Sequence, residues 1–353
     1  MTACAIDLFC GIGGLTKGLT LAGINVVAGF DNDESCRFAY EENNDASFIC
    51  KNVEDLLIED LEQYYPKTCV RILVGCAPCQ PFSRYSLRYR KNGQKDNKWS
   101  LLYSFQRLVT EAKPEIVSME NVPSLMKEKV FEDFKQNLEG LGYKVNITIA
   151  YCPDYGVPQN RKRLVLLASK LGNIRMLPPF YKKSTYKTVR TAIYGLPKII
   201  AGEVCEKDSL HRSSSLSNIN LQRIKSSIPG GTWRDWDKKL QLTCHGKNTG
   251  KSYPSVYGRM EWDKPSPTIT TQFYGYGNGR FGHPEQDRAI SLREGAILQS
   301  FPDDYIFADK THPVNKRELG THIGNAVPVE LGRAIGLSIM RHLKEHDIND
   351  EKN

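Results

Sequence analysis

Cys79 is the residue of this sequence best placed for covalent chemistry. It lies in the segment GCAPCQPFS (75–83), directly after the apolar run RILVG (71–75), which predicts a strand, and before a basic loop at 84–98. A cysteine at the end of a strand and next to a basic loop is typical of a thiolate nucleophile. The CxxC pair that it forms with Cys76 is a poor zinc site, because the sequence has no second CxxC, and a poor redox pair, because the flanks lack a thioredoxin-like pattern. A buried structural cysteine is the alternative.

A carboxylate and two arginines are candidates for acid–base chemistry. Glu120 follows the apolar segment EIVSM (115–119), which predicts a strand. A carboxyl group there could act as a general acid whose pKa is tuned by burial. Arg161 and Arg163 lie two residues apart at the entrance of another expected strand, so they share a side and could anchor a substrate or Glu120. The alternatives are a cap for the carboxylate and plain surface charge for the arginines.

The segment DLFCGIGG (7–14) joins an expected strand to an expected helix through glycines. This arrangement lets a cofactor approach the backbone and the N-terminus of the helix, although the spacing is not the GxGxxG of dinucleotide-binding loops. Asp31 ends the next expected strand (25–30), where a carboxylate suits the hydroxyls of a ribose. A tight turn and a helix N-cap are the alternatives for these two features.

All these groups follow expected strands, and strands alternate with helices up to about residue 180. Such alternation predicts an α/β fold with a doubly wound, mostly parallel sheet and helices on both faces, which binds ligands at the carboxyl ends of its strands. We expect a catalytic domain at 1–180 plus 285–345, to which a C-terminal helix returns, a smaller irregular domain at 181–284 and a polar tail at 346–353.

Positive charge is concentrated in the second of these domains. The chain has a net charge of +8, yet residues 181–280 alone hold 17 Lys and Arg against 7 Asp and Glu. Such a block favours a polyanionic partner such as nucleic acid, and a solvated basic face is the alternative. The sequence shows no signal peptide, and no run approaches the roughly 18 apolar residues of a membrane span. Ten cysteines without a disulfide framework indicate free thiols in a cytoplasmic protein, which we expect to be monomeric.

Six segments resemble, in order and spacing, the signature blocks of the cytosine-5 DNA methyltransferase family, in its bacterial restriction–modification type. They are DLFCGIGGL, GCAPCQPFS, ENV, QNRKRL, REGAILQSFPDDY and GNAVPVELGRAIG. The resemblance extends from about residue 3 to about residue 340, except for 181–255, where members of the family diverge. It implies a Rossmann-like fold of the S-adenosylmethionine-dependent methyltransferases with a target-recognition domain. It also implies methyl transfer from S-adenosyl-L-methionine to carbon 5 of a cytosine flipped out of duplex DNA.

The same resemblance implies roles for individual residues. Cys79 would attack carbon 6 of the cytosine, and Glu120 would contact its N3 and amino group. Arg161 and Arg163 would hold the base and the catalytic groups. The cofactor would be held by Phe9, Gly11, Gly13, Asp31, Asn32, Asn52, Val53, Pro78, Asn325 and Val327. The target base and its strand would be contacted by Gln80, Ser83, Arg84, Asn121 and Val122.

Two positions depart from the pattern of the family. Asn52 lies where the family often has an aspartate that accepts a hydrogen bond from the adenine amino group. Asn32 lies where a bulky apolar residue commonly follows the ribose carboxylate. An amide oxygen still accepts a hydrogen bond, but without charge, so we expect these changes to affect cofactor affinity more than the chemistry.

Contacts with DNA are expected from two segments. The loop at 84–98 contains six basic residues and one acidic residue, and we expect it to close over the flipped base. In the second domain, Arg234, Lys247, Asn248 and Arg259 are of the types that contact base edges. The expected partner is duplex DNA with a specific short sequence, which a cognate restriction endonuclease could share. The rival functions are a tRNA methyltransferase, whose branch carries a Cys-Phe-Thr tripeptide absent here, and a catalytically silent DNA-binding relative.

Overall fold

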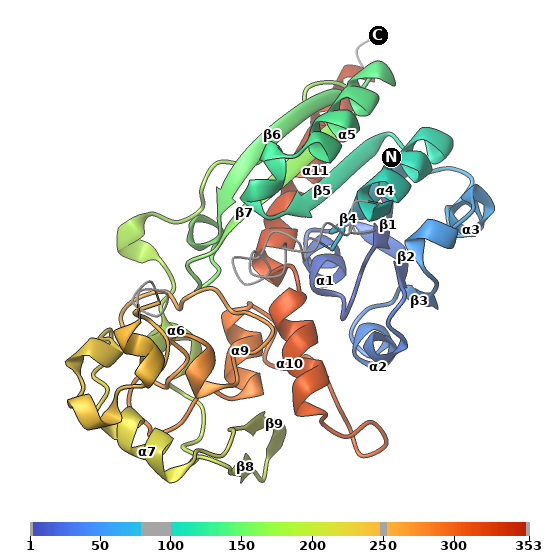
Figure 1. Cartoon of the computed structure of the whole chain (residues 1–353). Helices are drawn as coiled ribbons and strands as arrows, with labels where there is room; N and C mark the ends of the chain where they lie inside the picture. The colour runs from blue at the N-terminus through green and yellow to red at the C-terminus, as the bar shows by residue number, and fades with distance from the viewer. Residues whose placement is uncertain (1–2, 79–99, 248–252, 351–353) are drawn as a thin grey trace. The chain divides into compact units, whose positions relative to one another are not determined.

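The computed structural model describes residues 3–78, 100–247 and 253–350, the last four as backbone alone. The chain folds into two compact units, whose elements are labelled in Figure 1. The first unit comprises Met1–Tyr155, Lys162–Phe180 and Val327–Asn353, and the second comprises Gly156–Arg161 and Tyr181–Ala326.

A seven-stranded sheet forms the centre of the first unit, in the order β3-β2-β1-β4-β5-β7-β6. The strands β1 to β5 pair in parallel, whereas β7 is antiparallel to both β5 and β6. The prediction of a mostly parallel sheet is therefore confirmed. The strands are β1 (Ala3–Leu8), β2 (Asn25–Asp31), β3 (Ser47–Cys50), β4 (Val70–Gly75), β5 (Ile116–Asn121), β6 (Lys144–Tyr151) and β7 (Lys162–Ser169).

Helices cover both faces of this sheet (Figure 1). On one face, α4 and α5 pack against each other and bury Phe105 and Phe134 in the same apolar core as Leu8 and Val117 of the strands. On the other, α1 packs along α11. The helices of this unit are α1 (Gly14–Leu21), α2 (Arg37–Glu41), α3 (Ile58–Glu62), α4 (Ser100–Ala112), α5 (Lys129–Gly140) and α11 (Val329–Asp350).

The contact between α1 and α11 is close enough to require glycine. A Cβ atom on Gly18 would lie 2.5 Å from the Val329 carbonyl oxygen and 2.7 Å from the Gly332 carbonyl carbon. The backbones of the two helices therefore touch, and the C-terminal helix is fixed against the helix that follows the glycine loop.

The second unit is irregular, as the sequence predicts, and consists largely of short helices and turns. Two of its apolar clusters are small: one contains Trp233, Trp236 and Leu240, and another contains Ile224, Tyr276 and Ala289. Its described α-helices and strands are α6 (Val189–Ile193), β8 (Val204–Cys205), β9 (Asp208–Arg212), α7 (Asn218–Lys225), α9 (Leu292–Leu298) and α10 (Lys316–Asn325).

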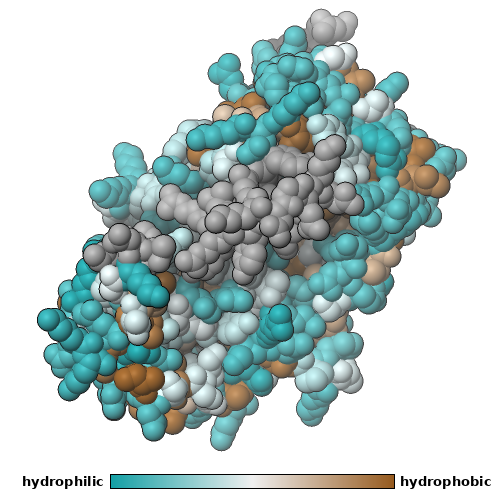
Figure 2. Space-filling view, viewed as in Figure 1, coloured by the Kyte–Doolittle hydropathy of each residue, from teal (hydrophilic) through white to brown (hydrophobic). Residues whose placement is uncertain are grey.

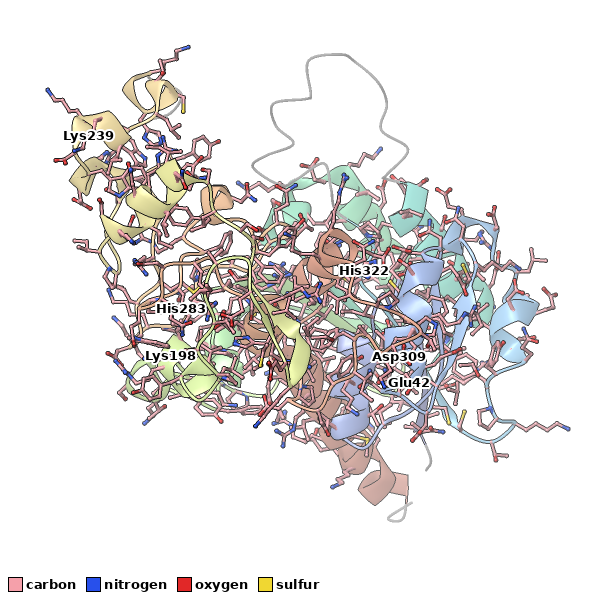
Figure 3. All side chains as sticks on the ribbon, turned by 90° about the horizontal axis from the view of Figure 1, so that it is seen from below. Glu42, Lys198, Lys239, His283, Asp309 and His322 are labelled. Atoms are coloured by element: carbon pink, nitrogen blue, oxygen red, sulfur yellow. The ribbon has the colours of Figure 1, made fainter. Side chains whose placement is uncertain are left out.

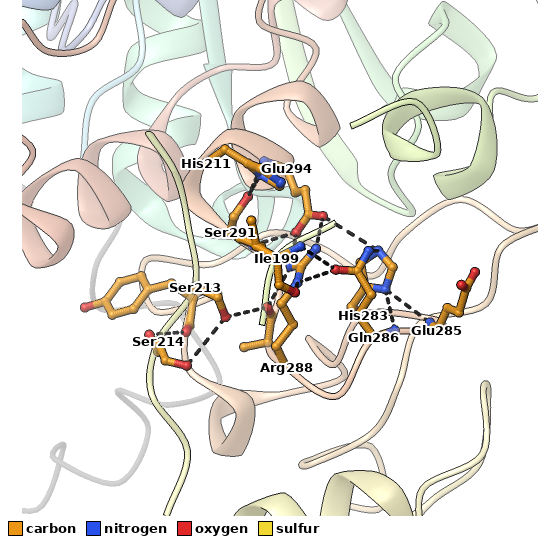
Figure 4. Close-up of polar contacts among 12 residues, drawn as sticks. Ile199, His211, Ser213, Ser214, His283, Glu285, Gln286, Arg288, Ser291 and Glu294 are labelled. Atoms are coloured by element: carbon orange, nitrogen blue, oxygen red, sulfur yellow. Dashed lines mark hydrogen bonds and ion pairs between the residues drawn. The ribbon is translucent and has the colours of Figure 1, made fainter. Parts of the chain in front are cut away.

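The expected boundary at residue 285 is wrong, because residues 285–326 belong to the second unit. The helix α9 packs against α6, α10 and β9, all of this unit. Just before it, Arg288 is fully buried and donates to both carboxylate oxygens of Glu294 at 2.7 Å (Figure 4). This segment supplies the polar core of the second unit, so it cannot be part of the first.

Across the described residues, none of the helices combines the length and the apolar character that crossing a membrane requires.

We predict that Gly18→Ala destabilises the first unit, because the added methyl group collides with backbone rather than with a movable side chain. Overpacking of this kind costs about 1–3 kcal/mol. At this domain size, the melting temperature should fall by roughly 2–4 °C for each kcal/mol. Calorimetry of the purified variant measures the change.

Gly140→Ala is the matched control. Gly140 ends α5, and nothing lies within 4 Å of the position of its Cβ atom, so alanine should leave the melting temperature unchanged or raise it slightly. Equal melting temperatures for Gly18→Ala and the wild type would contradict the close helix contact.

Candidate active site

Glu120 lies at the carboxyl end of β5, where its buried carboxylate has two partners. The side chain is 2% exposed. Arg163 places Nε 2.8 Å from Oε1 of Glu120, and Cys76 places Sγ 2.9 Å from Oε2. A carboxylate can remain charged at this depth only with such compensation. The site thus holds a fixed, charged acceptor at the edge of the sheet.

Strand register explains why these three residues meet. Gly75 of β4 pairs with Met119 of β5, so the residue after β4 lies beside Glu120. The strand β7 runs antiparallel to β5, and Leu164 pairs with Asn121, so the start of β7 delivers Arg163 to the same edge. Contacts between neighbouring strands therefore assemble the site.

Arg161 and Arg163, expected to act together, belong to different units. Arg161 is buried and donates to the Ile269 carbonyl oxygen at 3.1 Å and to Oε1 of Gln159 at 3.4 Å, both in the second unit. It precedes β7 instead of lying within it. The expectation that both arginines share a side of one strand is wrong for this reason.

Gln159 and Gln299 organise the surroundings of Arg161, and the sequence analysis missed both. Gln159 is fully buried, donates to Oε1 of Gln299 at 2.8 Å and accepts a hydrogen bond from the Ile269 amide at 2.9 Å. Gln299 donates to the Ile323 carbonyl oxygen at 2.7 Å. Both lie inside segments that carry the family resemblance, QNRKRL and REGAILQSFPDDY, which is the signal that pointed to them.

Asn121 holds the segment that leads to the candidate nucleophile. Its side-chain amide donates to the Ala77 carbonyl oxygen at 3.0 Å, and its Oδ1 accepts from the Val122 amide at 2.8 Å. The side chain is buried, so its contacts fix the backbone of 76–78, which ends at the exposed Pro78. Several predicted residues lie outside the described part of the chain: Cys79, Gln80, Ser83, Arg84, the rest of the loop at 84–98, and Asn248.

The glycine loop after β1 has the conformation expected of a cofactor site. Phe9, Gly11 and Gly13 have φ angles of 61°, 50° and 81°. A positive φ is rare for a bulky residue such as Phe9, and such strain gathers at ligand sites. The Gly11 amide donates to Oδ2 of Asp31 at 2.9 Å, and a Cβ atom on Gly11 would meet open space. The backbone is thus open to a ligand beside a carboxylate.

The other predicted cofactor residues differ in their surroundings. Asn52 caps the 3-10 helix Val53–Asp55, its Oδ1 accepting from the Glu54 amide at 3.5 Å. Asn32 and Asn325 are exposed, whereas Val53 and Val327 are buried. Val53 belongs to the apolar core of the sheet. The exposed residues are open to a ligand, and the buried ones act mainly in packing.

The GNAVP segment does not return as a whole to the first unit. Gly324 packs against the backbone at Thr270 in the second unit, where a Cβ atom would lie 2.5 Å from the carbonyl oxygen. The chain enters the first unit only at Val327. The expected return of the C-terminal segment therefore begins three residues later than Gly324.

Asp7, which the sequence analysis did not single out, is a buried acid directly below the glycine loop. It is 1% exposed, and the Thr16 hydroxyl donates to its Oδ2 at 2.7 Å. Within the described part of the chain, its Oδ1 has no hydrogen-bond partner. Burial, reinforced by the negative charge of Asp31, raises the pKa of Asp7 to about 7. The signal in the sequence was an acidic residue inside the apolar run ACAIDLF.

The structure separates the two arginines that were predicted to read DNA. Arg234 is exposed, with its guanidinium 5.3 Å from the centre of the Trp233 ring. Arg259 is buried, forms an ion pair with Asp287 and donates to the carbonyl oxygens of four residues: Ile224, Ser227, His283 and Gln286. Its guanidinium is committed to the fold, so the prediction that Arg259 contacts base edges is wrong.

Comparison with solved structures defines the class of the fold. One similar protein of known crystal structure is described as a DNA modification methyltransferase encoded within a prophage (E. coli), and it superposes on this chain with a TM-score of 0.75. The two sequences are 23% identical, and the match covers 97% of this chain and 99% of that one. The methyltransferase EhMeth of Entamoeba histolytica gives a TM-score of 0.65 at 17% identity over 97% and 99% of the two chains. At these identities the likeness shows the fold alone, which is that of a methyltransferase.

The sequences of relatives are more specific. The profile of C-5 cytosine-specific DNA methylases matches residues 4–341. The Type II methylase M.HgiDII of Herpetosiphon aurantiacus is 53% identical over 98% of this chain and 97% of its own length. The Type II methyltransferase M1.BsuMI of Bacillus subtilis (strain 168) is 32% identical over 95% and 80%. The chain belongs to the family of C-5 cytosine-specific DNA methylases, and it is an enzyme that methylates cytosine in DNA.

We predict that Asp7→Asn weakens the pH dependence of stability. The pKa of Asp7 is higher in the folded chain, about 7, than the ordinary 3.8, so the folded chain binds more protons between these values. Its contribution to stability is therefore lost as pH rises from about 4 to 7. Asparagine does not titrate and still offers an acceptor to Thr16. The fall in the free energy of unfolding with rising pH should therefore be smaller in the variant, by on the order of 1–3 kcal/mol.

Thermal melts at pH 5.5 and pH 8 measure this effect as the difference between the two melting temperatures. Asp55→Asn is the control, because Asp55 is an exposed acid, and it should keep the wild-type difference. An Asp7→Asn variant with the wild-type difference would show that Asp7 titrates alike in the folded and unfolded chain.

Proposed function

We propose that Cys79 is the nucleophile of this methyltransferase and that Glu120 and Arg163 bind the target cytosine beside it. The observation that supports the proposal most is the buried Glu120 carboxylate, fixed between Arg163 and Cys76 at the carboxyl ends of β4 and β5. Cys79 follows Cys76 by three residues in the sequence. The planar Glu120 carboxylate, held rigidly at this edge of the sheet, is suited to accept hydrogen bonds from the N–H groups of a cytosine ring.

In the proposed mechanism the Cys79 thiolate attacks carbon 6 of the cytosine, and the C5=C6 electron pair moves to carbon 5. N3 takes up a proton from solvent as this electron pair moves, and Glu120 accepts hydrogen bonds from N3–H and the 4-amino group, which stabilises the activated ring; N3 gives the proton back when the aromatic ring is restored. After methyl transfer a base removes the hydrogen from carbon 5, and the carbon–sulfur bond breaks to release Cys79. The covalent route divides one difficult step into easier ones. Because carbon 5 is stacked inside duplex DNA, the base must first be flipped out.

We propose S-adenosyl-L-methionine as the methyl donor, held at the glycine loop. When bound, it supplies an electrophilic methyl group on a sulfonium. The fit rests on the open space at Gly11, the positive φ of Phe9 and the carboxylate of Asp31, which is suited to ribose hydroxyls. Asn52 at the end of β3 is the candidate contact of the adenine, with Asn32 next to the ribose carboxylate.

The second unit is proposed to recognise the DNA sequence. It contains the block 181–280 with its excess of positive charge, and hydrophilic side chains cover much of its described surface in Figure 2. Exposed cations such as Arg234, Lys247 and Lys239, the last of which is labelled in Figure 3, are suited to phosphates or base edges. Since the relatives are named Type II methylases, we propose that the enzyme protects a short DNA word against a cognate endonuclease in a bacterial cytoplasm.

We predict that Cys79→Ser abolishes covalent trapping. Fluorine at carbon 5 cannot be eliminated, so a duplex with 5-fluorocytosine at the target should leave the wild-type enzyme attached to DNA. Cys79→Ser should give no adduct and lose nearly all turnover with labelled methyl donor, because a hydroxyl is a far weaker nucleophile at neutral pH. Cys76→Ser is the control and should keep both. An adduct formed by Cys79→Ser would refute the assignment.

We predict opposite effects for the two arginines. Arg234→Ala should keep the melting temperature and weaken DNA binding, by about 1–3 kcal/mol at particular base pairs if it reads a base. If it contacts a phosphate, binding should weaken equally for all sequences and the salt dependence should become less steep.

Arg259→Ala is the matched comparison. It leaves Asp287 without its partner and removes hydrogen bonds to four backbone carbonyl groups, so it should lower stability by roughly 2–4 kcal/mol. Melting curves measure the stability of both variants, and titrations with DNA measure their affinity and sequence preference. A stable Arg259→Ala protein with altered sequence preference would contradict the structural role.

A further inference from the structure

Cys76 has a thiol that the proposed mechanism does not use, and this thiol lies at the centre of the site. Its Sγ is 2.9 Å from Oε2 of Glu120, so the thiol donates to a carboxylate whose other oxygen is paired with Arg163. The side chain is half-buried, while Glu120 is buried. One oxygen of the carboxylate thus accepts a hydrogen bond from the thiol, and the other is in an ion pair with Arg163.

The backbone fixes the position of this thiol from two sides. The Cys76 amide donates to the Leu8 carbonyl oxygen at 3.3 Å, and the Asn121 side chain holds the carbonyl oxygen of Ala77 at 3.0 Å. The residue before Cys76 is equally confined, because a Cβ atom on Gly75 would lie 3.1 Å from both Leu8 and Phe105. The thiol therefore has little freedom to leave Glu120.

With a single contact, the carboxylate of a glutamate can still rotate about its last side-chain bond, because the χ3 torsion has no sharply preferred angle. Arg163 forms an ion pair with Oε1 through Nε, and the directional hydrogen bond from Cys76 to Oε2 adds the second contact that fixes the plane of the group. A thiol is a weak donor, so it orients the carboxylate without sharing much of its charge. The charge of the carboxylate therefore remains for a ligand.

We propose that Cys76 is a positioning residue that holds the Glu120 carboxylate in the plane required by the cytosine ring. The inference rests on the proposed function, in which Glu120 contacts N3 and the amino group of the base. It gives the two cysteines of the CxxC segment separate tasks: Cys79 forms the bond to carbon 6, and Cys76 orients the group that stabilises the ring.

The test compares Cys76→Ala, which removes the donor, with Cys76→Ser, which keeps one of similar size. A hydrogen bond to a charged group is worth about 1.5–3 kcal/mol, and a thiol lies at the low end, so kcat should fall about tenfold in Cys76→Ala. The KM values for DNA and for S-adenosylmethionine should stay within about twofold of the wild type, since this is the pattern of a lost transition-state interaction. Cys76→Ser should restore kcat to the wild-type value or above.

A double-mutant cycle separates positioning from a general loss of structure. In a Glu120→Gln background, Cys76→Ala should cause no additional loss, because the group through which it acts has been changed. Melting curves of all variants establish that they are folded.

The outcomes distinguish this inference from the proposed function. If Glu120→Gln has the wild-type rate, the proposed function itself is wrong. If Glu120→Gln is slow while Cys76→Ala matches the wild type, only the role of Cys76 is wrong. Equal losses in Cys76→Ala and Cys76→Ser, or a further loss from Cys76→Ala in the Glu120→Gln background, would overturn the positioning role, because the effect would then not depend on a donor to Glu120.

Discussion

The buried negative charge of Glu120 is the constraint on which the active site depends. An uncompensated carboxylate at 2% exposure would cost several kcal/mol, so the fold must bring a cation to it. Arg163 does this from the first residues of β7, and only an antiparallel strand can begin where the parallel β5 ends. The reversal of β7 is therefore the feature of the sheet that makes the catalytic edge possible.

A similar constraint organises the second unit, which has no large sheet. Arg288 and Glu294 are both fully buried and share two hydrogen bonds, and the Ser291 amide donates to the same carboxylate at 2.6 Å (Figure 4). The Arg288 charge offsets burial and holds the pKa of Glu294 at about 2, whereas burial lowers the pKa of His283 nearby to about 4. Buried polar pairs of this kind fix one geometry, because their hydrogen bonds are directional.

The sequence was sufficient to predict the elements and the chemistry of local segments. It indicated a mostly parallel sheet, the glycine loop and the end of β5 at Glu120, because each depends on residues close together in the chain. It could not show that Arg259 pairs with Asp287 inside the second unit or that Asp7 is buried beneath the glycine loop, since charge type alone does not reveal burial. The domain boundary at residue 285 was mispredicted for the same reason. In the sequence Arg288 and Glu294 are indistinguishable from surface charges, and only the structure shows that they are buried as a pair.

The order of the strands explains how the first unit brings Glu120, the Cys76 segment and the glycine loop to one edge of the sheet. The central strands β1, β4 and β5 are neighbours, and at their carboxyl ends lie the glycine loop, the Cys76 segment and Glu120. The glycine loop, the segment that leads to Cys79 and the Glu120 carboxylate therefore follow one another across the sheet at the spacing of adjacent strands, about 5 Å. Hydrogen bonds between neighbouring strands fix this row, so the positions of the three segments relative to one another depend on the first unit alone.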